Sequence, residues 1–378
     1  MDLSLFYSDD LLFFTFFFYL LCALIQLLFL WLVFGKLAFY RQKHAENQSI
    51  EPVSVVLCGK EIHPGREEHL LRILAQDHPD FEVIIVNESP DEEQKLYLET
   101  LAQRYPRLKI VNIGENLNFF RGRKFPLSIG IKSAGHDIIV LTDIDCMPAG
   151  DHWLSKIQAA FRPGTEIVLG YSTLLPQKGM LNSWIRFDSM LRGIRYLSFA
   201  LAGEPYMGIG ENLAYRKSLF YKVHGFTSHY KLMTGDDDLF INKVAGKNNT
   251  AIETETAGQV LCTGWTTFGA WLLQRKQHIE TQVYFKRRHK ILLGLNYLSL
   301  LLFYLTFLFL LRYPAVLITV LIIFGIRLFS FMFIIKKSMR KLNEKNLLLL
   351  SPFYELFLML VFAVLKVSVI FARTNKWK

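Results

Sequence analysis

Residues 137–145 read DIIVLTDID, and this stretch decides the fold. Its apolar centre, Ile138 to Leu141, has the length and β-branched content of a strand buried on both faces, as in a parallel sheet. The run ends on Asp143 and Asp145, and a period of two aims both carboxylates to the same side. Two such oxygen anions suit a hard cation, Mg2+ or Mn2+, that takes further ligands from substrate phosphates. At the carboxyl edge of an α/β sheet the pair predicts a nucleotide-sugar site, although calcium loops and plain turns also contain this spacing.

Strand-like and helix-like patterns alternate around this stretch, between residues 51 and 289. The expected order is βαβαβαβ, which is typical of a parallel sheet. The strands and helices before the acidic strand are expected at Val53–Cys58 (strand), Glu67–Gln76 (helix), Phe81–Asn87 (strand), Glu92–Tyr105 (helix), Leu108–Ile113 (strand) and Phe125–Ser133 (helix).

Polar residues follow three of the expected strands. Ligands gather at the carboxyl ends of such strands, so these residues are expected to converge although they lie far apart in the sequence. The set comprises Gly59, Lys60, Glu61, Asn87, Glu88, Ser89, Asp143 and Asp145. Taken singly, Glu61 and Glu88 are also typical of turns and helix N-termini.

The composition indicates membrane segments, because 52% of the 378 residues are hydrophobic, 14% are aromatic and the mean hydropathy is +0.25. Leu11 to Phe34 is apolar and long enough to cross a bilayer. Acidic residues precede this span and basic residues follow it, so we expect the N-terminus to face outward. The basic leader, short apolar core and small-residue cleavage site of a signal peptide are missing, which favours an uncleaved anchor.

Three further spans are expected near the C-terminus, at Ile291–Leu311, Pro314–Ile335 and Leu347–Phe371. The basic stretch Lys336 to Lys345 is expected inside and the short link at Arg312 outside. The last segment contains Pro352, Glu355 and Lys366 and ends in basic residues, so a re-entrant or interfacial hairpin is the alternative. Glu355 and Lys366 are each expected either to pair inside a helix bundle or to line something polar.

The net charge of +10 does not predict nucleic-acid binding. Much of the excess lies beside the membrane segments, where anionic lipid head groups are the simpler partner. The four cysteines Cys22, Cys58, Cys146 and Cys262 are far apart and have no metal-ligand spacing. They predict neither disulfides nor a zinc site.

In the order of its motifs along the sequence, the chain resembles the inverting family-two glycosyltransferases of GT-A fold. Within that family it resembles the membrane-anchored bacterial members that build polysaccharides or glycolipids. Residues 53–58 (VSVVLC) resemble the opening strand of that family, residues 83–89 (VIIVNES) its acidic strand end, and residues 142–145 (TDID) its DxD metal motif. The resemblance implies a Rossmann-like parallel or mixed sheet. It further implies a nucleotide-sugar site built from Glu61, Glu88, Lys124, Asp143 and Asp145, the last two also holding the metal. As a separate interpretation, Arg121, Arg123 and Lys124 also fit an ordinary solvated loop.

Residues 208–215 (GIGENLAY) form a glycine-containing approach to a short strand. The resemblance places acceptor-binding backbone here, at Gly210, Glu211 and Asn212. A dinucleotide fingerprint is excluded, because the third glycine and the strand–turn–helix context are missing.

Residues 234–239 (TGDDDL) place three adjacent carboxylates before an apolar helical run. Such acids also cap helices. The resemblance implies that the catalytic base lies here, at Asp236 or, as second choice, Asp237. Gly235 stands where the family usually has Glu, which leaves the identity of the base open.

Residues 271–278 (WLLQRKQH) resemble the family's Gln-x-x-Arg-Trp element, and Gln274 and His278 are expected to bind the acceptor. Gln277 replaces the usual Arg, so either Arg275 or Lys276 supplies the missing charge or the contacts to the acceptor are weaker. The alternative is an amphipathic interfacial helix that holds Trp265 and Trp271 at the membrane surface.

Together these features predict an N-terminal anchor and linker (1–50), a GT-A domain (51–289) and a C-terminal transmembrane region (290–378). The expected enzyme is a metal-dependent hexosyltransferase at the cytoplasmic face of the inner membrane, with a UDP-sugar as donor and a lipid-linked or polysaccharide acceptor. The alternatives are a processive polysaccharide synthase, a non-catalytic glycosyltransferase-like binding protein and a membrane phosphotransferase.

Overall fold

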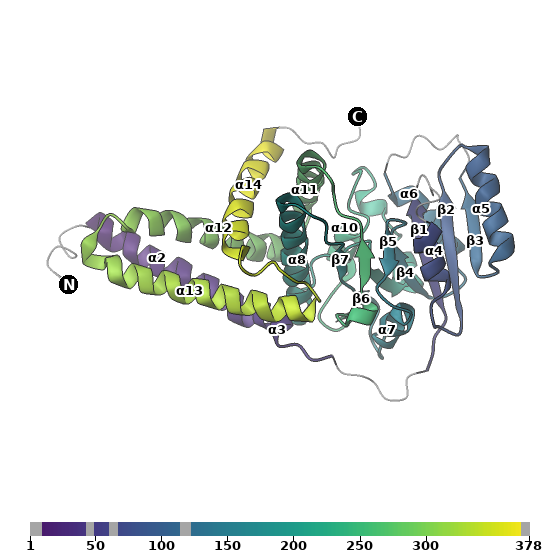
Figure 1. Cartoon of the computed structure of the whole chain (residues 1–378), viewed down its shortest axis with the longest axis horizontal. Coiled ribbons are helices and arrows are strands. Elements are labelled where there is room, and N and C mark those ends of the chain that lie inside the picture. Colours follow the sequence, from purple (N-terminus) through teal and green to yellow (C-terminus); the bar gives the residue numbers. More distant parts are fainter. Residues whose placement is uncertain (1–9, 43–48, 60–66, 114–121, 372–378) are drawn as a thin grey trace.

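The computed structural model describes residues 10–42, 49–59, 67–113 and 122–371. A mixed α/β domain is joined to long apolar helices that extend away from one of its sides (Figure 1). Its main sheet has seven strands in the order β3-β2-β1-β4-β8-β6-β9. Their bounds are β1 Val53–Gly59, β2 Phe81–Asn87, β3 Leu108–Asn112, β4 Ile138–Thr142, β6 Ile167–Leu169, β8 Leu213–Arg216 and β9 Thr250–Ile252. The predicted α/β class, with a mixed rather than wholly parallel sheet, is confirmed.

Parallel pairing places the carboxyl ends of β1, β2 and β4 at one edge of the sheet. Val53 of β1 lies opposite Phe81 of β2 and Ile138 of β4, and all three strands run in the same direction. β8 is antiparallel to both β4 and β6. The helices between the first four strands are α4 Glu67–Leu74, α5 Glu92–Arg104 and α6 Lys124–Ser133. The predicted βαβαβαβ order is therefore confirmed, and the predicted edge collects the strand ends.

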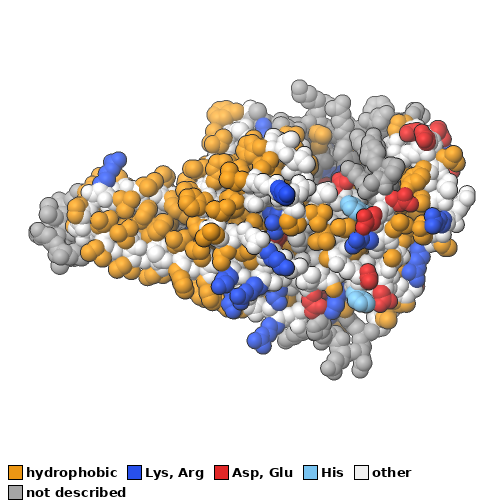
Figure 2. Space-filling model, in the orientation of Figure 1, with side chains coloured by type: hydrophobic (Ala, Val, Ile, Leu, Met, Phe, Trp, Pro, Cys, Tyr) orange, Lys and Arg blue, Asp and Glu red, His pale blue; other side chains and the backbone are white. Residues whose placement is uncertain are grey.

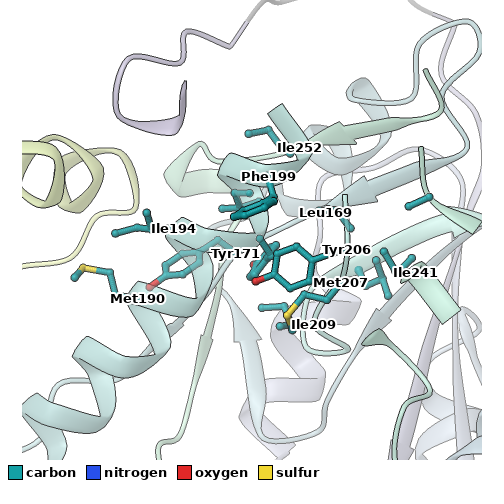
Figure 3. Packing of buried hydrophobic residues seen from close by; sticks show 14 of the residues in the cluster. Leu169, Tyr171, Met190, Ile194, Phe199, Tyr206, Met207, Ile209, Ile241 and Ile252 are labelled. Atoms are coloured by element: carbon teal, nitrogen blue, oxygen red, sulfur yellow. The ribbon is translucent and has the colours of Figure 1, made fainter. Parts of the chain in front are cut away.

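Helices cover both faces of the main sheet. Along β1, Val55 and Leu57 pack on the side of α4, α5 and α7 (Trp153–Ala159), whereas Val56 and Cys58 pack on the side of α6 and α8 (Met180–Leu201). Figure 3 shows part of the second layer, where buried side chains of α8 pack together with those of strands, of α10 and of the segments between them. The labelled residues are Leu169, Tyr171, Met190, Ile194, Phe199, Tyr206, Met207, Ile209, Ile241 and Ile252. Burial on both faces explains the continuous apolar runs of these strands.

A second sheet contains three short strands in the order β5-β10-β7, with bounds β5 Cys146–Pro148, β7 Ser172–Leu174 and β10 Val260–Cys262. Cys146 lies opposite Cys262 in the antiparallel β5/β10 pair, and the two form a disulfide across 116 residues of sequence. The prediction of no disulfide was therefore wrong. Strand pairing brings these thiols together, and sequence spacing carries no signal of it.

The remaining elements of the domain are α9 Lys217–Lys222, η4 Thr227–His229, α10 Asp238–Val244, η5 Thr256–Gly258 and α11 Phe268–Gln282. Among the residues that the structure describes, four helical stretches are long and apolar enough to cross a membrane. They are α2 Asp10–Leu28 continued by the π-helical η1 Phe29–Phe34 and by α3 Gly35–Ala38, then α12 Arg287–Leu310, α13 Pro314–Lys341 and α14 Ser351–Phe371.

Helices α2, α12 and α13 run side by side, whereas α14 stands at a steep angle to them and packs beside α11 (Figure 1). The last apolar segment is one continuous helix, so the alternative of a hairpin was wrong. Pro352 lies in the first turn of α14, where a missing backbone N–H breaks no helical hydrogen bond.

The two charged residues of α14 have different surroundings. Glu355 forms a buried ion pair with Arg327 of α13, with 2.7 Å between Oε1 and Nη2, and it also accepts a hydrogen bond from the Tyr304 hydroxyl. The Lys366 ammonium lies 3.6 Å from the centre of the Tyr297 ring and borders a cavity. Glu355 is thus a bundle partner, and Lys366 lines a cavity.

The exposed surface of the long helices is mostly apolar, and Lys and Arg side chains gather where these helices meet the α/β domain (Figure 2). This distribution is compatible with an apolar membrane region bounded by a basic interface.

Candidate active site

Two acidic segments from different parts of the chain face one cavity of about 480 Å³. Asp143 and Asp145 follow β4, and Asp236, Asp237 and Asp238 precede or begin α10. Of the other predicted site residues, the cavity wall contains Gly210, Glu211, Gln274 and His278. The fold therefore brings together the DxD pair, the acidic cluster and parts of both predicted acceptor segments.

The DxD pair lies in the turn between β4 and β5. β4 ends at Thr142, so strand alternation is not what orients Asp143 and Asp145, yet both carboxylates face the cavity. Arg123, immediately before α6, pairs with both carboxylate oxygens of Asp143, and one of the two N···O distances is 3.1 Å. Arg123 therefore places a fixed positive charge beside the DxD pair.

Asp237 is held by the backbone of two segments. Its carboxylate accepts hydrogen bonds from the amide of Gly210 at 3.0 Å and from the amide of Asp238 at 2.7 Å. Burial, together with the negative charges of Asp236, Asp238 and Glu211, raises the pKa of Asp237 well above its ordinary value. A carboxylate with raised proton affinity is suited to accept a proton from a substrate hydroxyl.

Asp238 is the buried member of the acidic cluster, and only 2% of it is exposed. It accepts hydrogen bonds from the Leu239 amide at 2.7 Å and from the Thr281 hydroxyl of α11. The Nδ1 atom of His278 lies 3.9 Å from its carboxylate. Asp238 therefore joins α10 to α11, which leaves Asp236 and Asp237 as the candidates for proton transfer.

Helix α11 is fixed to α8 by a buried polar cluster. The indole N–H of Trp271 donates to Asp188 at 2.8 Å, and Arg275 forms an ion pair with the same carboxylate. Trp271 is fully buried, so the interpretation that it lies at the membrane surface was wrong. Burial lowers the pKa of Arg275 to about 10, even though Asp188 raises it. Arg275 borders the cavity, but its charge is already compensated inside the protein.

The face of α11 that borders the cavity carries Gln274 and His278. Gln274 accepts a hydrogen bond from the Trp265 indole at 2.9 Å. His278 lies 3.3 Å from a guanidinium nitrogen of Arg192, which is on α8 and also lines the cavity. No sequence pattern indicated a role for Arg192, because it lies within a helix whose pattern is dominated by packing.

Three further predicted residues lie near the site without lining the cavity, and Glu61 lies outside the described residues. The Lys124 ammonium is buried and donates to the carbonyls of Leu232 and Thr234, which fixes the chain just before the acidic cluster. The Asn212 amide is fully buried and donates to the carbonyls of Tyr171 and Gly258. Their predicted roles toward nucleotide and acceptor stay predictions.

Glu88, at the carboxyl end of β2, shares one electrostatic environment with the acidic segments. Burial raises the pKa of the Cys58 thiol at the end of β1 to about 12, against the lowering influence of Arg123. The carboxylates of Glu88, Asp143 and Asp236 add to this rise. The groups that were expected to converge from three strands therefore act on one buried thiol.

The acidic residues present fit a divalent cation that shares its ligands with a substrate. Mg2+ and Mn2+ are typically held by one or two carboxylates plus phosphate oxygens, and Asp143 with Asp145 offers two such carboxylates. Within the described part of the chain, no group of three or more His, Cys, Asp or Glu side chains could hold a metal by itself. The chemistry of the site thus suits a cation that arrives with a diphosphate.

Comparison with known proteins identifies the domain. Residues 67–233 match the family model "Glycosyl transferase family 2". A search of curated protein sequences finds no match. Among solved structures, the chain is similar to mannosyltransferase PcManGT from Pyrobaculum calidifontis in complex with GDP-Man and Mn2+, with a TM-score of 0.56 and 17% identity over 87% of this chain and 97% of the other. It also matches S. aureus TarS 1-349, with a TM-score of 0.45 and 16% identity over 84% of this chain and 90% of the other.

The family match begins at α4 and ends just before the acidic cluster, and the mannosyltransferase shares the fold over most of both chains. The expected family resemblance is confirmed. Residues 67–233 thus match the family-two glycosyltransferases, whose reaction is glycosyl transfer, and the surrounding domain has the GT-A fold. Within the described residues this domain is joined to four apolar helices that can span a membrane.

Proposed function

We propose that this protein transfers a sugar from a nucleotide-diphosphate sugar to a lipid-linked or polysaccharide acceptor, with inversion at the anomeric carbon. The reaction takes place at the cytoplasmic face of the inner membrane. The observation that carries the proposal is the shared cavity, because it joins the DxD pair at the carboxyl edge of the sheet to the acidic cluster before α10. A donor diphosphate at the first and an acceptor hydroxyl at the second would meet across this cavity.

Transfer is a single displacement in this proposal. Asp236 takes the proton from the acceptor hydroxyl, and the hydroxyl oxygen forms a bond to the anomeric carbon. The bond from that carbon to the diphosphate breaks, and its electron pair leaves with the nucleoside diphosphate. Asp237, held by Gly210 and raised in pKa, is the second candidate for the base.

Asp143 and Asp145 would hold Mg2+ or Mn2+, which when bound offsets the charge that develops on the departing diphosphate. Arg123 keeps its own positive charge beside Asp143. Position 277 holds Gln where the family usually has Arg, and Arg123 and Arg192, which both border the cavity, would supply positive charge to the diphosphate in its place.

The test is release of nucleoside diphosphate by the full chain in lipid, from a panel of UDP- and GDP-sugars with Mn2+ or Mg2+. GDP-mannose belongs in the panel because the mannosyltransferase of similar fold was solved with it. We expect Asp145→Ala and Asp236→Asn each to lower the rate of release by at least about 10²-fold, whereas Arg162→Gln, outside the cavity, leaves it unchanged. Donor binding without release, even when cellular lipid extract supplies acceptors, would refute the enzyme and favour the non-catalytic alternative.

A further inference from the structure

A second cavity, of about 370 Å³, lies where the glycosyltransferase domain meets the apolar helices. Its walls come from α8 and α11 of the domain and from α12 and α14 of the helical region. It shares Arg192, Asp238, Arg275 and His278 with the first cavity, so these four residues belong to the walls of both. A ligand in the second cavity therefore lies directly beside the acidic cluster.

One side of this second cavity is strongly basic. Arg192, Arg195, Lys290 and Lys366 all line it. Within the residues that the structure describes, none of these four forms an ion pair with a carboxylate, whereas the fifth cation, Arg275, is paired with Asp188. The Nε atom of Arg195 is also buried without a hydrogen-bond partner in the described structure.

The carboxylates of Asp188 and Asp238 also line this cavity, but Asp188 is already paired with Arg275. The four cations repel one another, and the partly buried side chains of Arg192, Arg195 and Lys366 also lose hydration. Lys366 is additionally held against the Tyr297 ring, and Lys290 is directed to the carbonyl of Val283 at the edge of the cavity. An anion with several acceptor oxygens would relieve this repulsion and supply the missing partner for Arg195. Phosphate and diphosphate groups fit this requirement, since guanidinium groups bind them in bidentate geometry.

The opposite side of the cavity is apolar. Leu293 of α12 and Phe362, Val369 and Ile370 of α14 line it, and these helices are two of the four that can span a membrane. A ligand that fills both sides must carry a hydrocarbon chain next to a phosphate. A polysaccharide without a lipid offers no group for the apolar wall.

We propose that the second cavity binds the phosphate-bearing head of a lipid acceptor, with its phosphate on Arg192, Arg195, Lys290 and Lys366 and its chain along α12 and α14. The sugar hydroxyl attached beyond the phosphate then reaches the first cavity past His278 and Asp238. This inference rests on the proposed function, and it selects a lipid-phosphate acceptor over free polysaccharide.

Binding can be measured without any glycosyl transfer. The full chain is placed in phosphatidylcholine nanodiscs with hexadecyl phosphate, and the retained lipid is counted by native mass spectrometry. Hexadecanol tests whether the chain alone is sufficient, and inorganic diphosphate tests whether the anion alone is. We expect retention of hexadecyl phosphate, weak retention of hexadecanol and competition by diphosphate.

The variant Arg195→Gln/Lys366→Gln removes two cations that line only the second cavity. We expect it to bind hexadecyl phosphate at least about tenfold more weakly, because two charge-assisted contacts are lost. Its release of nucleoside diphosphate to water should stay at the wild-type rate. The matched control is Lys336→Gln/Arg340→Gln, which removes two exposed cations of α13 and should bind hexadecyl phosphate like wild type.

Two results would overturn the inference. One is equal binding of hexadecyl phosphate by the cavity variant and the control. The other is displacement of hexadecyl phosphate by an equal mole fraction of phosphatidylglycerol, which would make the cavity a site for bulk anionic lipid. Failure of the proposed function is distinct, because the wild-type protein would then release no nucleoside diphosphate from any donor while its binding of hexadecyl phosphate persists.

Discussion

The buried pair Asp188–Arg275 gives the sharpest test of how α11 is held at the site. Only 4% of the Asp188 side chain and 5% of the Arg275 side chain are exposed, and Trp271 donates to the same carboxylate. Asp188→Asn keeps an acceptor for Trp271 but leaves the Arg275 guanidinium without a counter-charge. We expect this change to cost about 3–5 kcal/mol, and Arg275→Met to cost about as much by leaving Asp188 alone.

The double variant Asp188→Asn/Arg275→Met removes both charges together. It should cost only about 1–3 kcal/mol, the penalty of a buried amide NH2 group that lacks an acceptor. The assay is urea unfolding in detergent, followed by tryptophan fluorescence. The matched control is Arg72→Met, which breaks the exposed Glu68–Arg72 pair and should cost no more than about 1 kcal/mol.

The reasoning would be refuted if the double variant lost as much stability as the two single variants lose together. An Arg275→Met protein with wild-type stability and weaker donor binding would also refute it, because that outcome assigns the Arg275 charge to the donor diphosphate. The distinction matters because Arg275 is a sequence-based candidate to replace the arginine that is missing at Gln277. The structure instead shows its guanidinium paired with Asp188.

Three further predictions concern the chemistry, the pH dependence and the cellular compartment. Asp236→Asn should lower kcat for transfer by about 10²–10⁴-fold with donor affinity unchanged, as measured by steady-state kinetics and by donor titration. Burial raises the pKa of Glu253 from 4.5 to about 7, so ionising it opposes folding and stability should fall as pH rises between these values. Glu253→Gln should remove that fall and gain up to about 3 kcal/mol on wild type above pH 7, measured by unfolding across pH; an unchanged pH profile would contradict this. A domain in the reducing cytoplasm should hold Cys146 and Cys262 as free thiols. Cells quenched in acid and then treated with an alkylating reagent should therefore yield both cysteines in alkylated form by mass spectrometry. A disulfide found in such cells would instead place the domain in an oxidising compartment.

The sequence predicted those features that depend on local pattern. The strands β1, β2 and β4 are apolar runs bounded by polar ends, and their parallel order follows from the helices between them. Asp143 and Asp145 were found because a strand pattern and a motif coincide. Asp236 and Asp237 were found from a motif alone, so the sequence could not separate their environments.

Contacts between distant elements could not be predicted in the same way. Asp188 and Arg275 are separated by most of the second half of the domain, and each looks like an ordinary polar residue of a helix. The disulfide depends on which short strands pair, and a three-residue strand has almost no sequence signal. The roles of Arg123 and Lys124 were likewise open, because adjacent positions at a helix start point in different directions.

The two cavities have opposite electrostatic character, and His278 stands between them. Burial, joined by the charges of Arg192 and Arg275, lowers the pKa of His278 against the raising influence of Asp238, which favours the neutral ring. The neutral ring neither compensates the acidic cluster on one side nor adds to the basic cluster on the other. A phosphate is therefore attracted to the cavity beside the apolar helices and repelled by the acidic cluster, whereas an uncharged hydroxyl meets no such barrier. In the proposed complex, this polarity favours the orientation in which the hydroxyl end of the lipid acceptor is directed toward Asp236.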